Sequence, residues 1–254
     1  MDGLNQAAAV NGSATSHDAR GNVTTDGLGT SFAYTSDNLM TSAAGAPLHY
    51  DPLGRLALVM GASWTLFAYD GGNIVAENET GDNLQFRYVY LGGELLMRYD
   101  GPGVANRADY HADERGSIVA GSSSQAAVTA VNRYDEYGMP PSGKSGRFQY
   151  TSQAWIPEAG LYYHRGRMYN PRLGRFMQPN PIGYGDGMNL YAYATGRAAG
   201  IPLNTLRRAA GFVQQPSAAG PGHWSDVFSG GYGDQPSDIP QIIYGYRHCG
   251  GSTP

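Results

Sequence analysis

Residues 161–176 have the sequence LYYHRGRMYNPRLGRF, and residues 180–193 have the sequence NPIGYGDGMNLYAY. Aromatic and polar residues alternate in both stretches, and Asn-Pro pairs and glycines interrupt them at short intervals. Proline fixes φ and donates no hydrogen bond to a β-ladder, while glycine and asparagine accept the positive φ that tight turns require. The pattern therefore predicts short β-strands joined by tight turns. Strands are expected at 146–150, 161–163, 168–169, 175–177 and 189–193.

A loose repeat, whose copies start 16 to 23 residues apart, precedes this block. Each copy has an aromatic residue or histidine, a turn usually containing Asp with Gly or Asn, and an apolar residue that begins the next strand. This turn chemistry favours β-hairpins, and units that bury their apolar faces only against neighbours stack into a curved β-ribbon. The copies are HDARGNV (17–23), YTSDNLM (34–40), YDPLGRL (50–56), YDGGNIV (69–75), a weaker YLGGELL (90–96), HADERGSIV (111–119) and YDEYGMP (134–140).

The two quoted stretches resemble the rearrangement-hotspot (RHS) repeat-associated core domain, and the upstream copies resemble YD repeats. The first matches the family's Tyr-Tyr, Arg-x-Arg-Tyr-Tyr-Asp-Pro and Gly-Arg-Phe series, and the second its Asp-Pro-Ile-Gly and Asn-Leu-Tyr-x-Tyr series. The resemblance implies an all-β fold, with YD repeats over 1–109 and the RHS core over 110–195. In longer family members such ribbons form a hollow shell around a toxin, and the core plugs one end. We interpret this chain as a C-terminal piece of such a protein.

Composition excludes several classes of partner. The chain has 17 Lys+Arg against 21 Asp+Glu and no basic cluster, so it lacks the electrostatic footprint of a nucleic-acid-binding protein. No apolar run approaches the roughly 18 residues of a membrane span, and the N-terminus is not a signal peptide. With a single cysteine, Cys249, no intramolecular disulfide forms. We expect a secreted or cell-surface location, reached without a signal peptide in this segment.

Residues 196–254 differ in character from the rest of the chain. They hold eleven Gly and six Pro and show no stable period, which predicts a mostly disordered tail. A short strand at 241–247 and a helical turn near 204–213 are too little for an independent toxin fold.

Two motifs are interpreted as decoys. Residues 138–145, GMPPSGKS, satisfy the P-loop pattern, but the approach to them is charged, two prolines remove amide donors, and a strand rather than a helix is expected to follow. We therefore predict that Lys144 binds no phosphate. The six histidines are scattered, and the adjacent His248 and Cys249 side chains would point apart in a strand. We predict no cofactor and no metal site.

The resemblance also implies a catalytic candidate. Many RHS cores are aspartyl autoproteases that use the Asp of Asp-Pro-Ile-Gly and a second Asp in a later Asp-Pro-x-Gly-Leu motif. Such a dyad needs one ionised and one protonated carboxyl group. Here the first position is Asn180, and no Asp-Pro dipeptide follows Tyr193. Either the variant is inactive, or a reading-frame change after Tyr193 replaced the usual ending. Asp186 is the nearest remaining carboxylate, at a position where the family has a Gly-rich turn.

We therefore predict no catalytic residues and a structural role: a part of an RHS/YD-repeat shell that encloses and helps to deliver a C-terminal toxin against competing bacteria. Its partners would be the rest of the shell, the toxin and secretion-system components. Two alternatives stay open: residual activity, as a degenerate autoprotease or as a toxin within 196–254, and a cell-surface adhesion or carbohydrate-binding module. The tyrosines and arginines of the core are expected to pack and to fix turns: Tyr162, Tyr163, Arg165, Arg167, Tyr169, Arg172, Arg175, Tyr191 and Tyr193.

Overall fold

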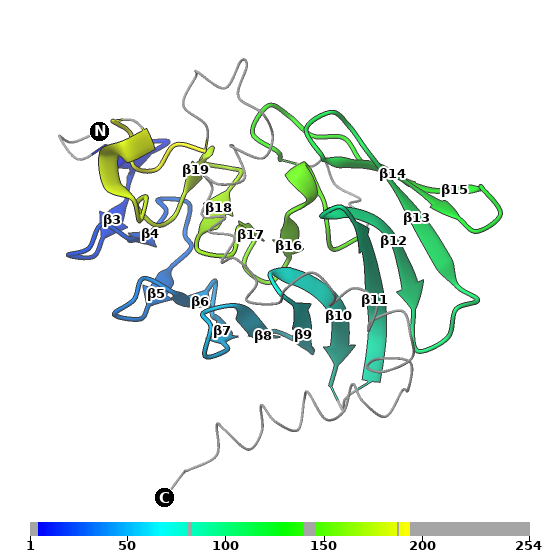
Figure 1. Ribbon diagram of the computed structural model, residues 1–254. Helices are drawn as coiled ribbons and strands as arrows, with labels where there is room; N and C mark the ends of the chain where they lie inside the picture. Colours follow the sequence, from blue (N-terminus) through cyan, green and yellow to red (C-terminus); the bar gives the residue numbers. More distant parts are fainter. Residues whose placement is uncertain (1–4, 81–82, 140–145, 187, 194–254) are drawn as a thin grey trace, which may run out of the picture.

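The computed structural model describes residues 5–80, 83–139, 146–186 and 188–193. These residues form β-strands, turns and two short 3-10 helices, so the predicted all-β fold is confirmed (Figure 1). Eleven antiparallel strands make one sheet, here called the ribbon, in which the strands pair in chain order. Four more antiparallel strands make a second sheet, here called the core sheet.

The ribbon strands are β5 (Phe32–Tyr34), β6 (Met40–Ala43), β7 (Ala46–Tyr50), β8 (Leu56–Met60), β9 (Trp64–Asp70), β10 (Asn73–Glu79), β11 (Asn83–Leu91), β12 (Glu94–Asp100), β13 (Arg107–Ala112), β14 (Ile118–Ser123) and β15 (Val128–Val131). The core sheet contains β16 (Ala154–Ile156), β17 (Leu161–Tyr163), β18 (Met168–Asn170) and β19 (Arg175–Phe176). Two small hairpins, β1 (Ala9–Val10) with β2 (Ser13–Ala14) and β3 (Ser16–His17) with β4 (Val23–Thr25), precede the ribbon. The 3-10 helices are η1 (Tyr150–Ser152) and η2 (Gly183–Asp186).

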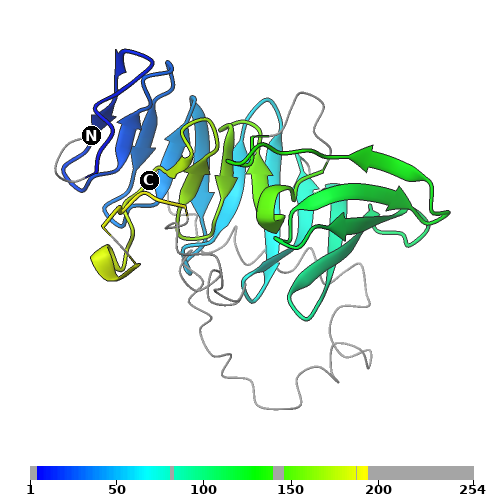
Figure 2. The same cartoon turned by 90° about the horizontal axis from the view of Figure 1, so that it is seen from above.

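The ribbon is curved and surrounds the core sheet on its inner side (Figure 1). Seen from above, its strands follow one another across the molecule in sequence order, from blue to green (Figure 2). This is the curved meander that the repeat pattern predicts, because each unit pairs only with the units next to it.

One five-residue turn recurs in the ribbon and in the segments on either side of it. At Asp51, the carboxylate Oδ1 accepts the backbone N–H groups of Leu53 and Arg55, both at 2.9 Å, and the backbone N–H of Asp51 donates to the carbonyl of Arg55. Gly54, at the fourth position, has φ +74°, a left-handed conformation that glycine adopts without steric cost. The same carboxylate geometry recurs in the turns that begin at Asp18, Asp26, Asp113 and Asp135.

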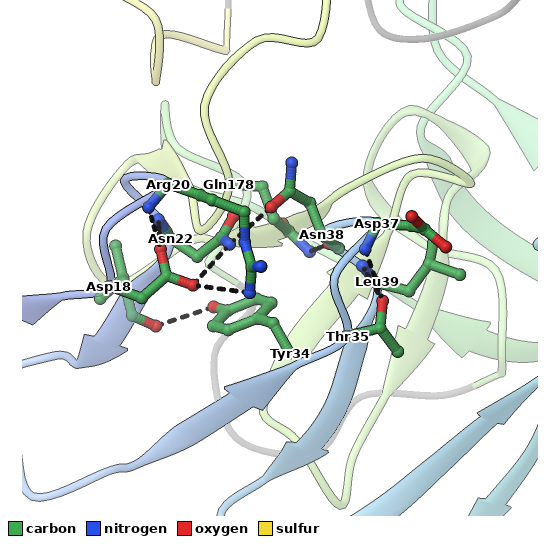
Figure 3. Close-up of polar contacts among 10 residues, drawn as sticks. Asp18, Arg20, Asn22, Tyr34, Thr35, Asp37, Asn38, Leu39 and Gln178 are labelled. Carbon is green, nitrogen blue, oxygen red and sulfur yellow. Dashed lines mark hydrogen bonds and ion pairs between the residues drawn. The ribbon is translucent and has the colours of Figure 1, made fainter.

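Three units vary this turn. One has another residue in place of the aspartate, and two form a different, shorter turn. In the second unit Thr35 replaces the aspartate, and its hydroxyl accepts the N–H groups of Asp37 and Leu39 (Figure 3). The YDGGNIV and YLGGELL units form shorter hairpins, in which two glycines separate the last residue pair of the ladder. A two-residue glycine turn suits the twist of paired strands, so both unit types produce the same meander.

In six of the seven units, the first apolar residue after the turn enters a common core. Those residues are at most 5% exposed and belong to one cluster: Val23, Met40, Leu56, Ile74, Leu95 and Ile118. The tyrosine of a following unit often secures the same residue, since the hydroxyl of Tyr69 donates to the carbonyl of Leu56 at 2.7 Å. Tyr34, Tyr90 and Tyr134 make the equivalent bonds to Val23, Ile74 and Ile118. Each tyrosine thus ties two neighbouring units together.

Two predicted strands are absent. Residues 189–193 contribute only the isolated bridge between Ala192 and Arg175, because Asn189 Oδ1 accepts the N–H of Tyr191 and holds these residues in a turn. Residues 146–150 likewise provide a single bridge at Phe148, since the chain reverses through η1 directly afterwards.

The proposed boundary between 109 and 110 falls inside β13, whereas the change from the ribbon to the core sheet lies between β15 and β16. The predicted tail at 196–254, with Cys249, His223 and His248, lies outside the described residues, as do residues 140–145 of the P-loop-like stretch with Lys144.

The capping of the five-residue turn by Asp51 can be tested by removing its carboxylate. Asp51→Ala deletes the acceptor for two backbone N–H groups and an ion pair to Arg55, so we expect a loss of about 1–2 kcal/mol in the free energy of unfolding, measured by urea titration. Asp37→Ala is the matched control, because this exposed carboxylate points away from its turn (Figure 3). Its effect should stay within about 0.5 kcal/mol. Equal effects of the two substitutions would contradict a capping role for Asp51.

Candidate functional site at the ribbon–core interface

The core sheet has two apolar faces with different partners. Side chains alternate between the faces of a strand, so neighbours in β17 and β18 separate into two groups. Leu161, Tyr163 and Met168 join the cluster that contains the apolar residues of the ribbon units. The other face forms an aromatic cluster of Tyr150, Trp155, Tyr162, Tyr169 and Phe176, against which Tyr134 and Tyr193 pack. The core sheet therefore covers the inner face of the ribbon with one side and carries a second core on the other.

Leu56 shows how closely the two sheets are joined. Its N–H donates to the hydroxyl of Tyr163 in the core sheet at 2.9 Å, in a buried bond between residues 107 positions apart. Its carbonyl accepts the hydroxyl of Tyr69 from the ribbon. Buried backbone polar groups must be paired, so these two tyrosines make one repeat position the anchor for both sheets.

A buried ion pair links the ribbon to the segment that leads into the core sheet. Glu77 of β10 is 3% exposed, and Arg147 donates to it from Nε at 3.0 Å and from Nη2 at 2.9 Å. The hydroxyl of Tyr88 donates to the same carboxylate at 2.6 Å, and Arg147 Nη1 donates to the carbonyl of Trp155 at 2.9 Å. Every group of this network that faces the interior therefore has a partner.

The electrostatics of this network follow from burial and charge. Burial acts to lower the pKa of Arg147, but the charge and hydrogen bonds of Glu77 outweigh it, and the net pKa is raised. Burial, followed by the Glu77 charge, raises the pKa of the Tyr88 hydroxyl well above its usual value. Breaking a buried pair by removing one partner typically costs about 3–5 kcal/mol, because the remaining charge is left without compensation.

A second polar network joins the first two turns of the chain to the core sheet (Figure 3). The side-chain amide of Asn22 donates to Asp18 Oδ2 at 2.9 Å and to Asn38 Oδ1 at 2.8 Å, so it bridges two successive turns. Gln178 reaches the same place from the core: its Nε2 donates to the carbonyl of Asn38, and its Oε1 accepts the N–H of Met168. Burial acts to raise the pKa of Asp18, but its hydrogen bonds from Asn22 and Arg20 outweigh this, and the net pKa is lowered.

The end of the described chain closes over the same region. The hydroxyl of Tyr191 donates to the carbonyl of Gly21 at 2.7 Å, and the N–H of Val23 donates to the carbonyl of Met177. Arg175 lies over the ring of Tyr191 and donates from Nη2 to the carbonyl of Asn5 at 2.7 Å. Residues about 170 positions apart therefore meet at this end of the ribbon.

Most of the nine predicted packing residues are placed as expected. Tyr162, Tyr163, Tyr169 and Tyr191 are at most 3% exposed, and Arg167 is buried over the ring of Phe176. Arg165 lies at the surface of the interface and donates to Asn73 Oδ1 at 3.1 Å. Arg172 differs, because its side chain is exposed and only its N–H enters the turn, as a donor to Asn170 Oδ1.

His164 lies at the centre of the aromatic cluster. Its ring makes edge contacts with Tyr169, Phe176 and Tyr193 at centroid distances of 5.3–5.8 Å, and its Nε2 has no hydrogen-bond partner among the described residues. Burial, helped by the charge of Arg167, lowers the pKa of His164 to about 3. The imidazole is therefore neutral and acts here as an aromatic core residue.

Asn180 has the geometry of the repeat turns. Its Oδ1 accepts the N–H of Ile182 at 3.3 Å, the N–H of Gly183 donates to its carbonyl, and Gly183 has φ +63°. The backbone N–H of Asn180 donates to the carbonyl of Leu190, which closes the loop. Asp186 lies in η2, but its side chain is outside the described part of the structure. At this position the amide serves as a turn cap.

Two further kinds of site are not found among the described residues. Among the described residues, no group of three His, Cys, Asp or Glu side chains is close enough to hold a metal ion. In the same part of the chain, no helix is long and apolar enough to span a membrane.

Sequence reasoning missed the residues that form the polar networks. Glu77 stands in a strand whose neighbours, Asn78 and Glu79, are also polar, so nothing local marks it as buried. Gln178 lies between two recognised motif series. The first network is recognised only in three dimensions, where Arg147 and Tyr88 lie on either side of the buried Glu77 carboxylate.

Comparison with known proteins finds no matching family model. Similar proteins are nevertheless found. The chain is 32% identical over 213 residues to the tRNA nuclease WapA of Bacillus subtilis, a match that covers 76% of this chain and 9% of that protein. It is 35% identical over 97 residues to the toxin protein Tse5 of Pseudomonas aeruginosa, covering 36% of this chain and 7% of Tse5. The chain thus spans about a tenth of the length of these relatives.

The crystal structure of TcdB2-TccC3 has a similar fold. The TM-score is 0.52 at 17% sequence identity, and the match covers 69% of this chain and 10% of that one. At this level of identity the likeness concerns the fold alone.

The Glu77–Arg147 pair can be tested by substitution. Arg147→Met leaves the buried Glu77 carboxylate without its cation, so we expect a loss of about 3–5 kcal/mol in the free energy of unfolding, measured by urea titration at pH 7. Glu77→Gln should cost a similar amount. Because the double substitution leaves no unpaired charge, it should cost less than the sum of the two, and additive costs would contradict a direct pairing.

The burial of a neutral His164 predicts an acid-sensitive fold. The unfolded chain binds a proton near pH 6.5 and the folded chain only near pH 3, so stability is lost as the pH falls between these values, by about 1.4 kcal/mol per pH unit. Urea titrations at pH 6.5 and 4.5 should therefore show wild type losing ~2–3 kcal/mol more than His164→Phe. The exposed His111→Gln serves as the control and should behave as wild type. Equal pH dependence of wild type and His164→Phe would show that His164 does not couple folding to pH.

Proposed function

The chain belongs to the RHS/YD-repeat toxin-shell family, and we propose that it is a non-catalytic, structural part of such a shell, which encloses and helps to deliver a C-terminal toxin. Its partners would be the remaining ribbon of the shell, the enclosed toxin and components of a secretion system. The place of action would be outside the producing cell or at its surface.

The observation that supports this proposal is the seating of the core sheet on the ribbon. A curved ribbon alone leaves an apolar inner face in water, which favours aggregation. Here the core sheet covers that face at several separate points, including Leu56–Tyr163, Glu77–Arg147 and Asn38–Gln178. A segment fastened in this way is suited to hold the end of a shell in a fixed shape.

The non-catalytic part of the proposal is supported by Asn180. The aspartyl autoprotease that the family resemblance implies needs a carboxylate at this position to act as base or acid, and an amide can be neither. The amide of Asn180 instead caps a turn of the same type as the repeats. A turn cap has a structural use without any chemistry.

The structural role can be tested by cutting the link between the two sheets. A recognition site for a specific protease is inserted between residues 139 and 146, and the folded protein is cleaved there. If the core sheet is held by the contacts described above, the two pieces co-elute in size-exclusion chromatography in buffer. In the Arg147→Met variant they should separate at a lower urea concentration. Separation of the wild-type pieces in buffer alone would count against the proposal.

The absence of self-cleavage is tested by mass. We expect the purified protein to retain its intact mass after days at neutral pH, and Asn180→Asp alone to leave it intact, since no second Asp-Pro motif follows Tyr193. Because a carboxylate caps this type of turn as well as an amide does, Asn180→Asp should unfold at the same urea concentration as wild type. A unique break near the core in the unmodified protein would overturn the non-catalytic assignment, and Asp186 would be the first residue to substitute.

A further inference from the structure

A cleft of about 530 Å³ lies where hairpin turns of the ribbon meet a turn of the core sheet. Its walls come from the β6–β7 turn, from the β8–β9 turn and from Glu158, which stands between β16 and β17. The volume is within the range of small-ligand sites, about 300–1,000 Å³. This cleft is remote in the sequence from Asn180 and takes no part in the two polar networks.

The cleft has one aromatic and one charged side chain among small apolar ones. Trp64 is 48% exposed and lines the cleft together with Glu158. The remaining lining residues are alanine, glycine, proline and methionine. Glu158 passes directly over Gly61, where an added Cβ would lie 2.6 Å from Glu158 Cγ. The glycine therefore allows the carboxylate to reach this place.

Within the described part of the chain, one carboxylate oxygen of Glu158 is buried without a hydrogen-bond donor. Its Oε2 is buried and has no hydrogen-bond partner among the described residues, and none of the ion pairs in that part of the chain includes it. The charge of Glu158 helps to raise the pKa of Arg147. The hydrogen-bond donors of Arg147, however, go to Glu77 and to the carbonyl of Trp155. Because Oε2 itself is buried, a donor in the cleft would pair with this carboxylate through its other oxygen and its charge.

We propose that this cleft binds the guanidinium group of an arginine side chain presented by a polypeptide, between the indole of Trp64 and the carboxylate of Glu158. A planar guanidinium stacks on an aromatic ring and forms a charge-assisted hydrogen bond to a carboxylate, and an aliphatic stem suits the small apolar walls. An anionic or purely apolar ligand would leave Glu158 unpaired. The proposal adds a binding activity and does not rest on the shell role.

The test uses the full chain and the tryptophan fluorescence that Trp64 supplies from the cleft. Titration with N-acetyl-L-arginine methylamide at constant ionic strength should give a saturable change with a Kd on the order of millimolar, as expected for one side chain. N-acetyl-L-norleucine methylamide, which keeps the stem and lacks the cation, should bind at least tenfold more weakly. The titrations use a Trp224→Phe background, because Trp224 lies outside the described residues. In that background Trp64→Leu should remove the signal, because the remaining tryptophan, Trp155, is buried.

Two variants test the carboxylate itself. Glu158→Gln keeps the shape and should raise the Kd roughly tenfold or more, because the guanidinium loses its anionic partner and keeps only a neutral amide oxygen as acceptor. Gly61→Ala should have a similar effect by displacing Glu158, whereas Gly103→Ala, which meets no atom within 4 Å, should not. Circular dichroism melting confirms that each variant is folded. No saturable signal in wild type, equal binding of the norleucine compound, or an unchanged Kd in folded Glu158→Gln would overturn the proposal.

Discussion

The buried pair of Glu77 and Arg147 determines how the core sheet can sit on the ribbon. Apolar packing between two sheets tolerates small shifts, since it is non-directional. A carboxylate that is 3% exposed does not tolerate them, because a shift would leave it without its three donors from Arg147 and Tyr88. The bond from Arg147 to the carbonyl of Trp155 extends the same constraint into β16. The remaining contacts of the interface, including those of Leu56 and Gln178, depend on this seating.

The same type of side-chain-capped turn occurs in the repeats and in the core. An oxygen at the first position of a turn accepts two N–H groups, or one in the core, and a left-handed residue stands at the fourth position. Asp51 with Gly54 shows it in the repeats, and Asn180 with Gly183 shows it in the core. Carboxylate and amide oxygens cap such a turn equally well. This equivalence explains how an amide can occupy Asn180 while the turn geometry is kept.

The two faces of the core sheet have different roles. The face toward the ribbon carries the contacts that place it, while the opposite face holds an aromatic cluster around His164. A neutral imidazole beside the charge of Arg167 is expected to make this second cluster one source of acid sensitivity in the fold. The cleft with Trp64 and Glu158 lies apart from both, at the rim where turns of the two sheets meet. Structural support and the proposed arginine site are thus located in different places.

The sequence by itself determined the strand-and-turn order, the apolar position that follows the turn in most units, and the family. These follow from local rules: which residues accept a positive φ, which oxygens cap a turn, and which side of a strand is apolar. The same rules wrongly predicted a strand at 189–193, where the side chain of Asn189 holds a turn. Only the tertiary structure brought Glu77 to Arg147 and Leu56 to Tyr163, and placed Glu158 over Gly61. Those contacts depend on the curvature of the ribbon and on the position of the second sheet. Both result from many packing contacts between distant parts of the chain, so the residues adjacent in sequence do not specify them.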